Sequence, residues 1–119
     1  MPLPETHLRQ IARWCEQKVP ERLRFRVRVE YKVRGSNVTL HECHVPIGAT
    51  PETKWFRQPM AQLRYDGSSW QLYWAERHFS EHPGRWVAVD YDPRGTAPSP
   101  GPLLDMIADP RVSFFGEKD

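Results

Sequence analysis

Cationic side chains recur at alternate positions in one segment of the sequence, where they could bind an anionic ligand. In a strand, alternate side chains lie roughly 6.5–7 Å apart on one face, close to the spacing of successive phosphates in an extended nucleic acid strand. Tyr73 or Trp55 could add a stacking surface. The charge pattern of residues 22–34 predicts a face that binds nucleic acid or a protein partner. Its residues are Arg22, Arg24, Arg26, Arg28, Lys32 and Arg34, with Tyr73 beside them.

The same pattern also fits a solvated sheet face. Charged side chains keep a long strand in solution and block edge-to-edge pairing with other sheets. The chain has 17 Lys and Arg residues against 15 Asp and Glu residues, a formal net charge of +2. A chain so close to neutrality is unlike a general nucleic acid coat protein. The charge pattern therefore leaves both interpretations open.

A second candidate is the carboxylate of Glu42, which alternation places among apolar side chains. A lone buried charge is costly, so Glu42 must be paired or protonated, and Arg85 or Arg77 could pair with it. A shielded carboxyl group with a raised pKa suits a general acid or base, and His44 on the same face could assist. The alternative is a structural ion pair at the margin of the sheet. Glu42, His44 and Arg85 are thus the catalytic candidates.

Histidine and cysteine side chains raise the question of a metal site. His41 and Cys43 share one strand face, and His78 and His82 have a spacing found in zinc sites. Together they would make a permissible tetrahedral set. The first pair is separated by one residue, however, and the second lies in a predicted loop, so neither matches an established zinc motif. We therefore expect no metal and no cofactor.

The first element that positions these residues is a helix over residues 5–19, ended by Pro20. Its apolar stripe is spaced by three and four residues and consists of Leu8, Ile11, Ala12, Cys15 and Val19. Residues 23–34 then alternate between apolar and charged side chains. Period-two alternation over that length predicts a long strand with one apolar and one charged face.

Two hairpins are predicted to follow one another. In the first, Gly35 and Ser36 form a two-residue turn into a strand at 38–44, which sets Val29 opposite Glu42. In the second, residues 66–69 join strands at 60–65 and 70–77. A short strand at 86–89 and a short helix complete the domain, and residues 112–115 dock as a tail. The helix is predicted to begin at Pro100, after a Ser99 cap, and to end at Asp109-Pro110. The fold class is α+β, with an N-terminal helix and a short C-terminal helix packed on one face of a mainly antiparallel sheet of about five strands.

Length and composition bound the class of protein. A chain of 119 residues fits a single domain, 1–119, and 39% hydrophobic residues suffice for one core. The start of the chain lacks the pattern of an export signal, and no run of eighteen apolar residues occurs. With only two cysteines, we expect a cytoplasmic protein with reduced thiols and no membrane partner. A homodimer is compatible with this composition.

Short segments spread over nearly the whole chain share a pattern with a known family. They are Arg13-Trp14-Cys15, Val19-Pro20, Gly35, Val38-Thr39-Leu40 with Glu42, Met60-Ala61-Gln62-Leu63-Arg64-Tyr65, Trp70 with Leu72-Tyr73-Trp74, Arg85-Trp86, Tyr91-Asp92, Leu103-Leu104, Asp109 and Phe114-Phe115-Gly116. On these segments the chain resembles the bacterial domain-of-unknown-function family three thousand and twenty-four. The resemblance implies no established activity, substrate or cofactor. Two departures stand out: His44 replaces an arginine that is usual there, and the segment from His78 to Gly84 looks like an insertion.

These observations favour a non-enzymatic binding or accessory domain for a macromolecular partner in a bacterial cytoplasm. The alternative is a small enzyme that uses Glu42 as general acid or base in a pocket at the sheet edge. A third option is an oligomeric structural protein. A basic groove would favour the first, and a concave pocket around Glu42 would favour the second.

Overall fold

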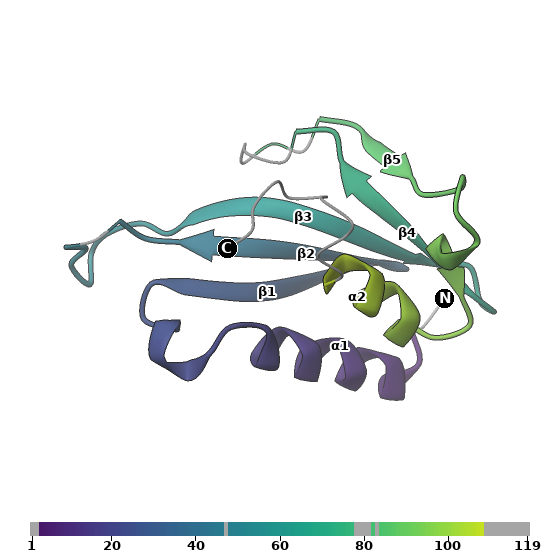
Figure 1. The fold of residues 1–119 in the computed structure, drawn as a ribbon, viewed down its shortest axis with the longest axis horizontal. Helices are drawn as coiled ribbons and strands as arrows, with labels where there is room; N and C mark the ends of the chain where they lie inside the picture. The colour runs from purple at the N-terminus through teal and green to yellow at the C-terminus, as the bar shows by residue number, and fades with distance from the viewer. Residues whose placement is uncertain (1–2, 47, 78–81, 83, 109–119) are drawn as a thin grey trace.

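A twisted antiparallel sheet with helices on one side forms the fold, as a computed structural model of the chain shows (Figure 1). The structure describes residues 3–46, 48–77, 82 and 84–108. The strands follow the order β1-β2-β3-β4-β5, and β6 pairs with β4. In chain order the elements are α1 (Glu5–Lys18), η1 (Glu21–Leu23), β1 (Val27–Arg34), β2 (Asn37–His44), β3 (Phe56–Tyr65), β4 (Trp70–Ala75), β5 (Trp86–Ala88), η2 (Pro93–Gly95), β6 (Thr96–Ala97) and α2 (Gly101–Ala108).

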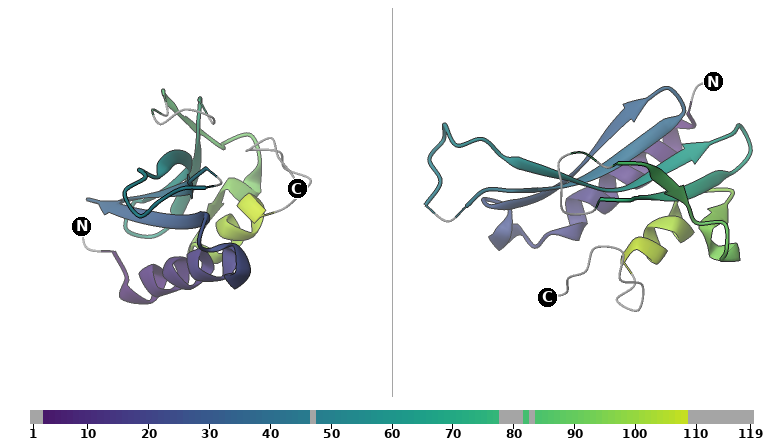
Figure 2. Two further views of the ribbon diagram at one scale, coloured as in Figure 1. Left: turned by 90° about the vertical axis from the view of Figure 1, so that its left-hand side faces the viewer. Right: turned by 90° about the horizontal axis from the view of Figure 1, so that it is seen from above.

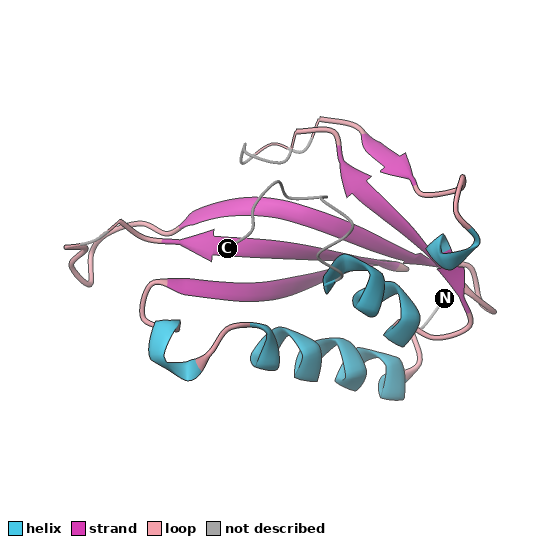
Figure 3. Cartoon of the chain, viewed as in Figure 1, coloured by secondary structure: helices cyan, strands magenta, loops and turns pink. Residues whose placement is uncertain are grey.

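Helices α1 and α2 cover the same face of the sheet (Figures 2 and 3). The predicted apolar stripe of α1 is buried at Ile11 and Cys15, and the buried face of α2 includes Leu103 and Leu104. They pack on sheet residues that are also buried: Val38, Leu40, Leu63, Trp70 and Leu72. The predicted fold class is therefore confirmed. Of the helices in the described ranges, none combines the length and hydropathy needed to cross a membrane.

The strand predicted to begin at Leu23 begins instead at Val27. Residues 21–23 form the 3-10 helix η1, and the Arg26 amide donates to the carbonyl of Leu23. The chain must reverse here because α1 and β1 lie side by side. As a result Phe25, predicted to be buried by alternation, is 72% exposed. Arg22, Arg24 and Arg26 are likewise not part of the charged strand face, which corrects that prediction.

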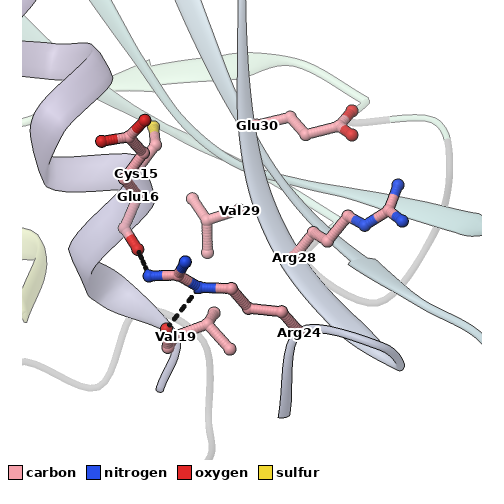
Figure 4. Close-up of a pocket in the computed structure, with 7 residues that line it drawn as sticks. All are labelled: Cys15, Glu16, Val19, Arg24, Arg28, Val29 and Glu30. Carbon is pink, nitrogen blue, oxygen red and sulfur yellow. Dashed lines mark hydrogen bonds between the residues drawn. The ribbon is translucent and has the colours of Figure 1, made fainter. Parts of the chain in front are cut away.

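Arg24 has a structural task at this reversal. Its Nη2 donates to the carbonyl of Glu16 at 2.6 Å and its Nε to the carbonyl of Val19 at 3.3 Å. These carbonyls lie at the C-terminal end of α1, where a cation also stabilises the helix dipole. Figure 4 shows the guanidinium closing a hollow of about 190 Å³ between α1 and β1, beside Cys15 and Val29.

Replacing Arg24 with alanine should lower the free energy of unfolding by about 1 kcal/mol, since it removes both hydrogen bonds to the helix end. Urea denaturation followed by circular dichroism measures the change. Arg22→Ala is the matched control, because Arg22 is an exposed arginine two residues away and its loss should cost less than about 0.5 kcal/mol. Equal losses in the two variants would contradict this role of Arg24.

Both predicted hairpins have the predicted register. In the first, Val29 pairs with Glu42, and Gly35 occupies the turn with a φ of 61°. That left-handed conformation favours glycine. In the second, Tyr65 pairs with Trp70 across the loop 66–69. Strand β3 is longer than predicted, and its pairing with β2 is shifted between Leu40 and His41 by an irregularity of the β-bulge type.

The region predicted to be an irregular connection between β5 and α2 contains two short elements. Asp92 caps η2 by accepting a hydrogen bond from the Arg94 amide. Thr96 and Ala97 then pair with β4 as the short strand β6. The C-terminal helix lies where it was predicted, whereas the predicted tail at 112–115 is outside the described residues.

Candidate functional site

The face of the sheet opposite the helices, here called the polar face, carries most of the chemistry. Cross-strand partners share a face, so the register places Arg28, Lys32, Arg34, Arg57 and Arg64 there, with Glu30 as the single carboxylate in β1–β4. The β2 side chains between these cations are Asn37, Thr39, His41 and Cys43. Strands β4 and β5 rise on the side away from α1 and α2, which makes the polar face concave (Figure 1).

Three of the five cations are held by neighbours. Arg57 Nη2 lies 2.9 Å from Glu30 Oε1, the Arg28 guanidinium stacks 4.1 Å from the Trp55 ring centre, and that of Arg64 stacks 3.9 Å from Tyr73. The aromatic rings predicted as stacking surfaces, Trp55 and Tyr73, therefore already hold an arginine. These contacts leave Lys32 and Arg34 as the remaining two cations of this face.

Lys32 and Arg34 are the two cations of the polar face for which the described part of the chain shows neither an ion pair nor a contact with an aromatic ring. They line a groove of about 270 Å³ in the polar face. The other lining residues are Asn37, Thr39, His41, Pro59, Gln62 and Trp86. Two free cations beside hydrogen-bonding groups and an aromatic ring are the components of a site for an anionic, planar ligand.

Trp86 is a residue of the groove that was not among the predicted binding residues. It pairs with Ala75 at the far edge of the sheet, yet its half-buried ring lines the same groove as Lys32 on β1. The alternation of residues 86–89 could have indicated its orientation. If Val87 and Val89 face the core, Trp86 must face the opposite side of the sheet. Its approach to β1 depends on the curl of β4 and β5, which no local pattern shows.

His41 forms part of the groove as a neutral imidazole. Burial lowers its pKa below the ordinary value, and the positive charges of Arg57 and Lys32 lower it further, against a smaller opposing effect of Glu30. A neutral imidazole offers one donor and one acceptor, which suits recognition of a polar ring edge. An anion bound between Lys32 and Arg34 would raise this pKa again.

The lowered pKa of His41 predicts a loss of stability in mild acid. The unfolded chain takes up this proton near pH 6.5 and the folded chain only at lower pH, so the free energy of unfolding falls below about pH 6.5 and levels off below the folded pKa. In His41→Gln this component is absent, and the variant should lose less stability between about pH 7 and pH 5. Urea unfolding at these pH values tests the difference, and identical losses in both proteins would contradict it.

The three catalytic candidates are not brought together. Only Glu42 and His44 are neighbours: Glu42 Oε1 lies 3.4 Å from His44 Nε2 on the helix side of the sheet, with side chains 33% and 40% exposed, so Glu42 is not shielded as predicted. Arg85 pairs with Glu76 at 4.0 Å and is 85% exposed. Strands β3 and β4 separate it from Glu42. An exposed pair of this kind gives little support to general acid–base catalysis.

The candidate metal ligands are also dispersed. His41 and Cys43 share the polar face, where burial and the charge of Glu30 raise the pKa of the Cys43 thiol. Cys15 lies on the buried side of α1, and the pKa of its thiol is raised to about 12, mainly by burial. His82 is exposed, and His78 lies outside the described residues. Within the described ranges no cluster of three or more His, Cys, Asp or Glu side chains could hold a metal ion.

Comparison with protein families extends the sequence resemblance to almost the whole chain. The family model described as "Domain of unknown function (DUF3024)" matches residues 2–116. The chain belongs to this family. No curated protein and no solved structure is detectably similar to it. Since DUF3024 has no assigned activity, the function of this member must be argued from its groove.

Proposed function

We propose that this DUF3024 domain is a non-enzymatic binding module that holds single-stranded nucleic acid across its polar face. The observation that carries the proposal is the groove that Lys32 and Arg34, which have no ion-pair or aromatic partner in the described residues, line together with Trp86. Phosphates pair with cations and bases stack on aromatic rings, so a strand of nucleic acid uses both features at once. We place this activity in a bacterial cytoplasm, in keeping with the two free, buried cysteines.

The shape of the polar face favours a single strand over a duplex. Reading the major groove of a duplex requires a helix or a projecting two-stranded ribbon. Here the cations lie on β1 and the aromatic ring on β5, at opposite margins of a concave surface. A single strand can lie along β1 with its phosphates near Lys32 and Arg34 while its bases point toward Trp86.

The same groove favours nucleic acid over an acidic protein partner. An acidic peptide would pair with the cations, and its backbone could hydrogen-bond to Asn37 and His41, but it would leave the Trp86 ring without a flat stacking partner. A nucleotide supplies an anion, a flat ring and a polar ring edge together. The groove thus matches the nucleotide in charge, hydrogen bonding and stacking, and the acidic peptide only in the first two.

Fluorescence anisotropy tests the proposal with a labelled single strand of about twelve nucleotides, as DNA and as RNA, against the matching duplex and a labelled polyglutamate peptide. We expect the single strands to bind most tightly. Their log Kd should rise with log salt concentration between about 50 and 200 mM, with a slope near 0.7 for each phosphate contacted. Absence of binding, or tighter binding of the duplex or the peptide, would overturn the proposal.

A further inference from the structure

We infer that the groove beside Trp86 is a base-capture pocket, which takes one base of the strand out of its stack and holds the attached phosphate on Lys32 and Arg34. The inference rests on the proposed function and adds which residues of the groove bind the base and which bind the phosphate. The ligand class is a nucleoside monophosphate unit. Its base lies against Trp86, its ring edge faces Asn37 and His41, and its phosphate faces β1.

The aromatic rings of the polar face differ in availability, and this difference identifies the stacking residue. Trp55 is covered by Arg28 and Tyr73 by Arg64, with ring-to-guanidinium distances of 4.1 Å and 3.9 Å. Trp86 has no ring, cation or hydrogen-bond partner in the described part of the chain. Trp86 is half-buried and lines the groove, so part of its ring surface is already out of water before a ligand arrives. A half-buried side chain has fewer rotamers to lose on stacking than a fully exposed one.

Some hydrogen-bonding side chains of the groove are already bonded to other protein groups, whereas others are available to a ligand. Gln62 donates to Thr39 Oγ1 at 2.9 Å and accepts from Arg64 Nε at 2.6 Å, so its amide is committed to the protein. The side chains of Asn37 and His41 make no hydrogen bond within the described ranges. Both offer a donor and an acceptor, which are the groups that read the edges of unstacked bases.

The size of the groove sets the number of bases. Its volume is about 270 Å³. Sites for drug-sized molecules are usually about 300–1,000 Å³, so this groove suits one planar base rather than a stack of several. Lys32 and Arg34 lie two residues apart on β1, roughly 7 Å, which allows both to approach one phosphate or two successive phosphates. One base and its adjacent phosphates therefore match the dimensions.

A strand without bases separates this inference from the proposed function. We would compare a labelled oligonucleotide of about five nucleotides with an abasic strand of equal length and charge. For the wild-type protein we expect the strand with bases to bind on the order of tenfold more tightly, the contribution of one stacked base. Trp86→Ala should bind the two strands equally, with its affinity for the abasic strand unchanged.

Two further variants make the result interpretable. Trp86→Phe keeps an aromatic ring and should retain part of the preference, which guards against a Trp86→Ala protein that fails to fold. Tyr91→Ala removes an aromatic ring that is 65% exposed and outside the groove, and its preference should equal that of the wild type. If wild type binds both strands with equal affinity, or if both Trp86 variants keep its full preference, the base-capture pocket is refuted while the proposed function stands. If neither strand binds, both are refuted.

Discussion

The double variant Lys32→Ala/Arg34→Ala should bind single-stranded nucleic acid about ten- to hundredfold more weakly than the wild type at about 50 mM salt. The expectation follows from counterion release, since each cation that neutralises a phosphate of a single strand releases about 0.7 of a counterion. Both side chains are exposed and lack an ion-pair partner in the described residues, so their charge is available to a ligand. Removing both should also lower the slope of log Kd against log salt by about 1.4.

Anisotropy titrations over a salt series measure affinity and slope together. The matched control is Arg9→Ala/Arg13→Ala, which removes the same charge from the exposed side of α1. We expect that control to change the affinity less than about threefold, because charges separated by more than the Debye length, roughly 14 Å at this salt concentration, are largely screened. Similar losses in the two double variants would mean that only overall charge matters, and the polar face would lose its special role.

Trp70→Ala should lower the free energy of unfolding by about 3–5 kcal/mol, the usual cost of deleting a buried tryptophan side chain. Trp70 is 0% exposed and lies in β4 between α1 and the sheet core. Its Nε1 donates a hydrogen bond to His7 Nδ1 at 3.0 Å, and its ring packs 4.9 Å from that of Tyr65. The substitution therefore removes core contacts and also breaks the contact that joins the first turns of α1 to β4.

Urea denaturation of Trp70→Ala, His7→Ala and the double variant measures both contributions. His7→Ala should cost about 1–3 kcal/mol, since it leaves the indole N–H without its acceptor. The double variant should lose less than the sum of the two single losses, because the pair interacts directly. Phe25→Ala serves as the control for an exposed aromatic ring. If Trp70→Ala costs no more than Phe25→Ala, the described packing of α1 on the sheet is wrong.

The strand pairing could be predicted from sequence because two local signals agreed. Alternation assigned the faces, and Gly35 fixed the turn, so the register between β1 and β2 followed, including the pair of Val29 and Glu42. The error at residues 22–26 has the same origin. Alternation reports which residues would share a face if the chain were extended, but it does not report that the chain must reverse after α1.

The site was only partly predictable for a related reason. Lys32 and Arg34 followed from alternation, and Tyr73 was correctly expected on the polar face. Which cations are already occupied depends on partners from other strands, as with Arg57 at Glu30. Trp86 joins the groove only through the curl of β4 and β5. Burial of Glu42 was expected from its apolar neighbours, yet its place near the end of β2 leaves it partly exposed.

We expect the polar face, and not the helix face, to bind single-stranded nucleic acid. Titration of the isotope-labelled protein with an unlabelled single strand, followed by two-dimensional amide NMR, tests it most directly. We predict that the largest shifts occur at the backbone amides of Lys32, Thr39 and Gln62 and at the indole N–H of Trp86. Shifts confined to α1, or to the end of β2 around Glu42 and His44, would contradict the claim.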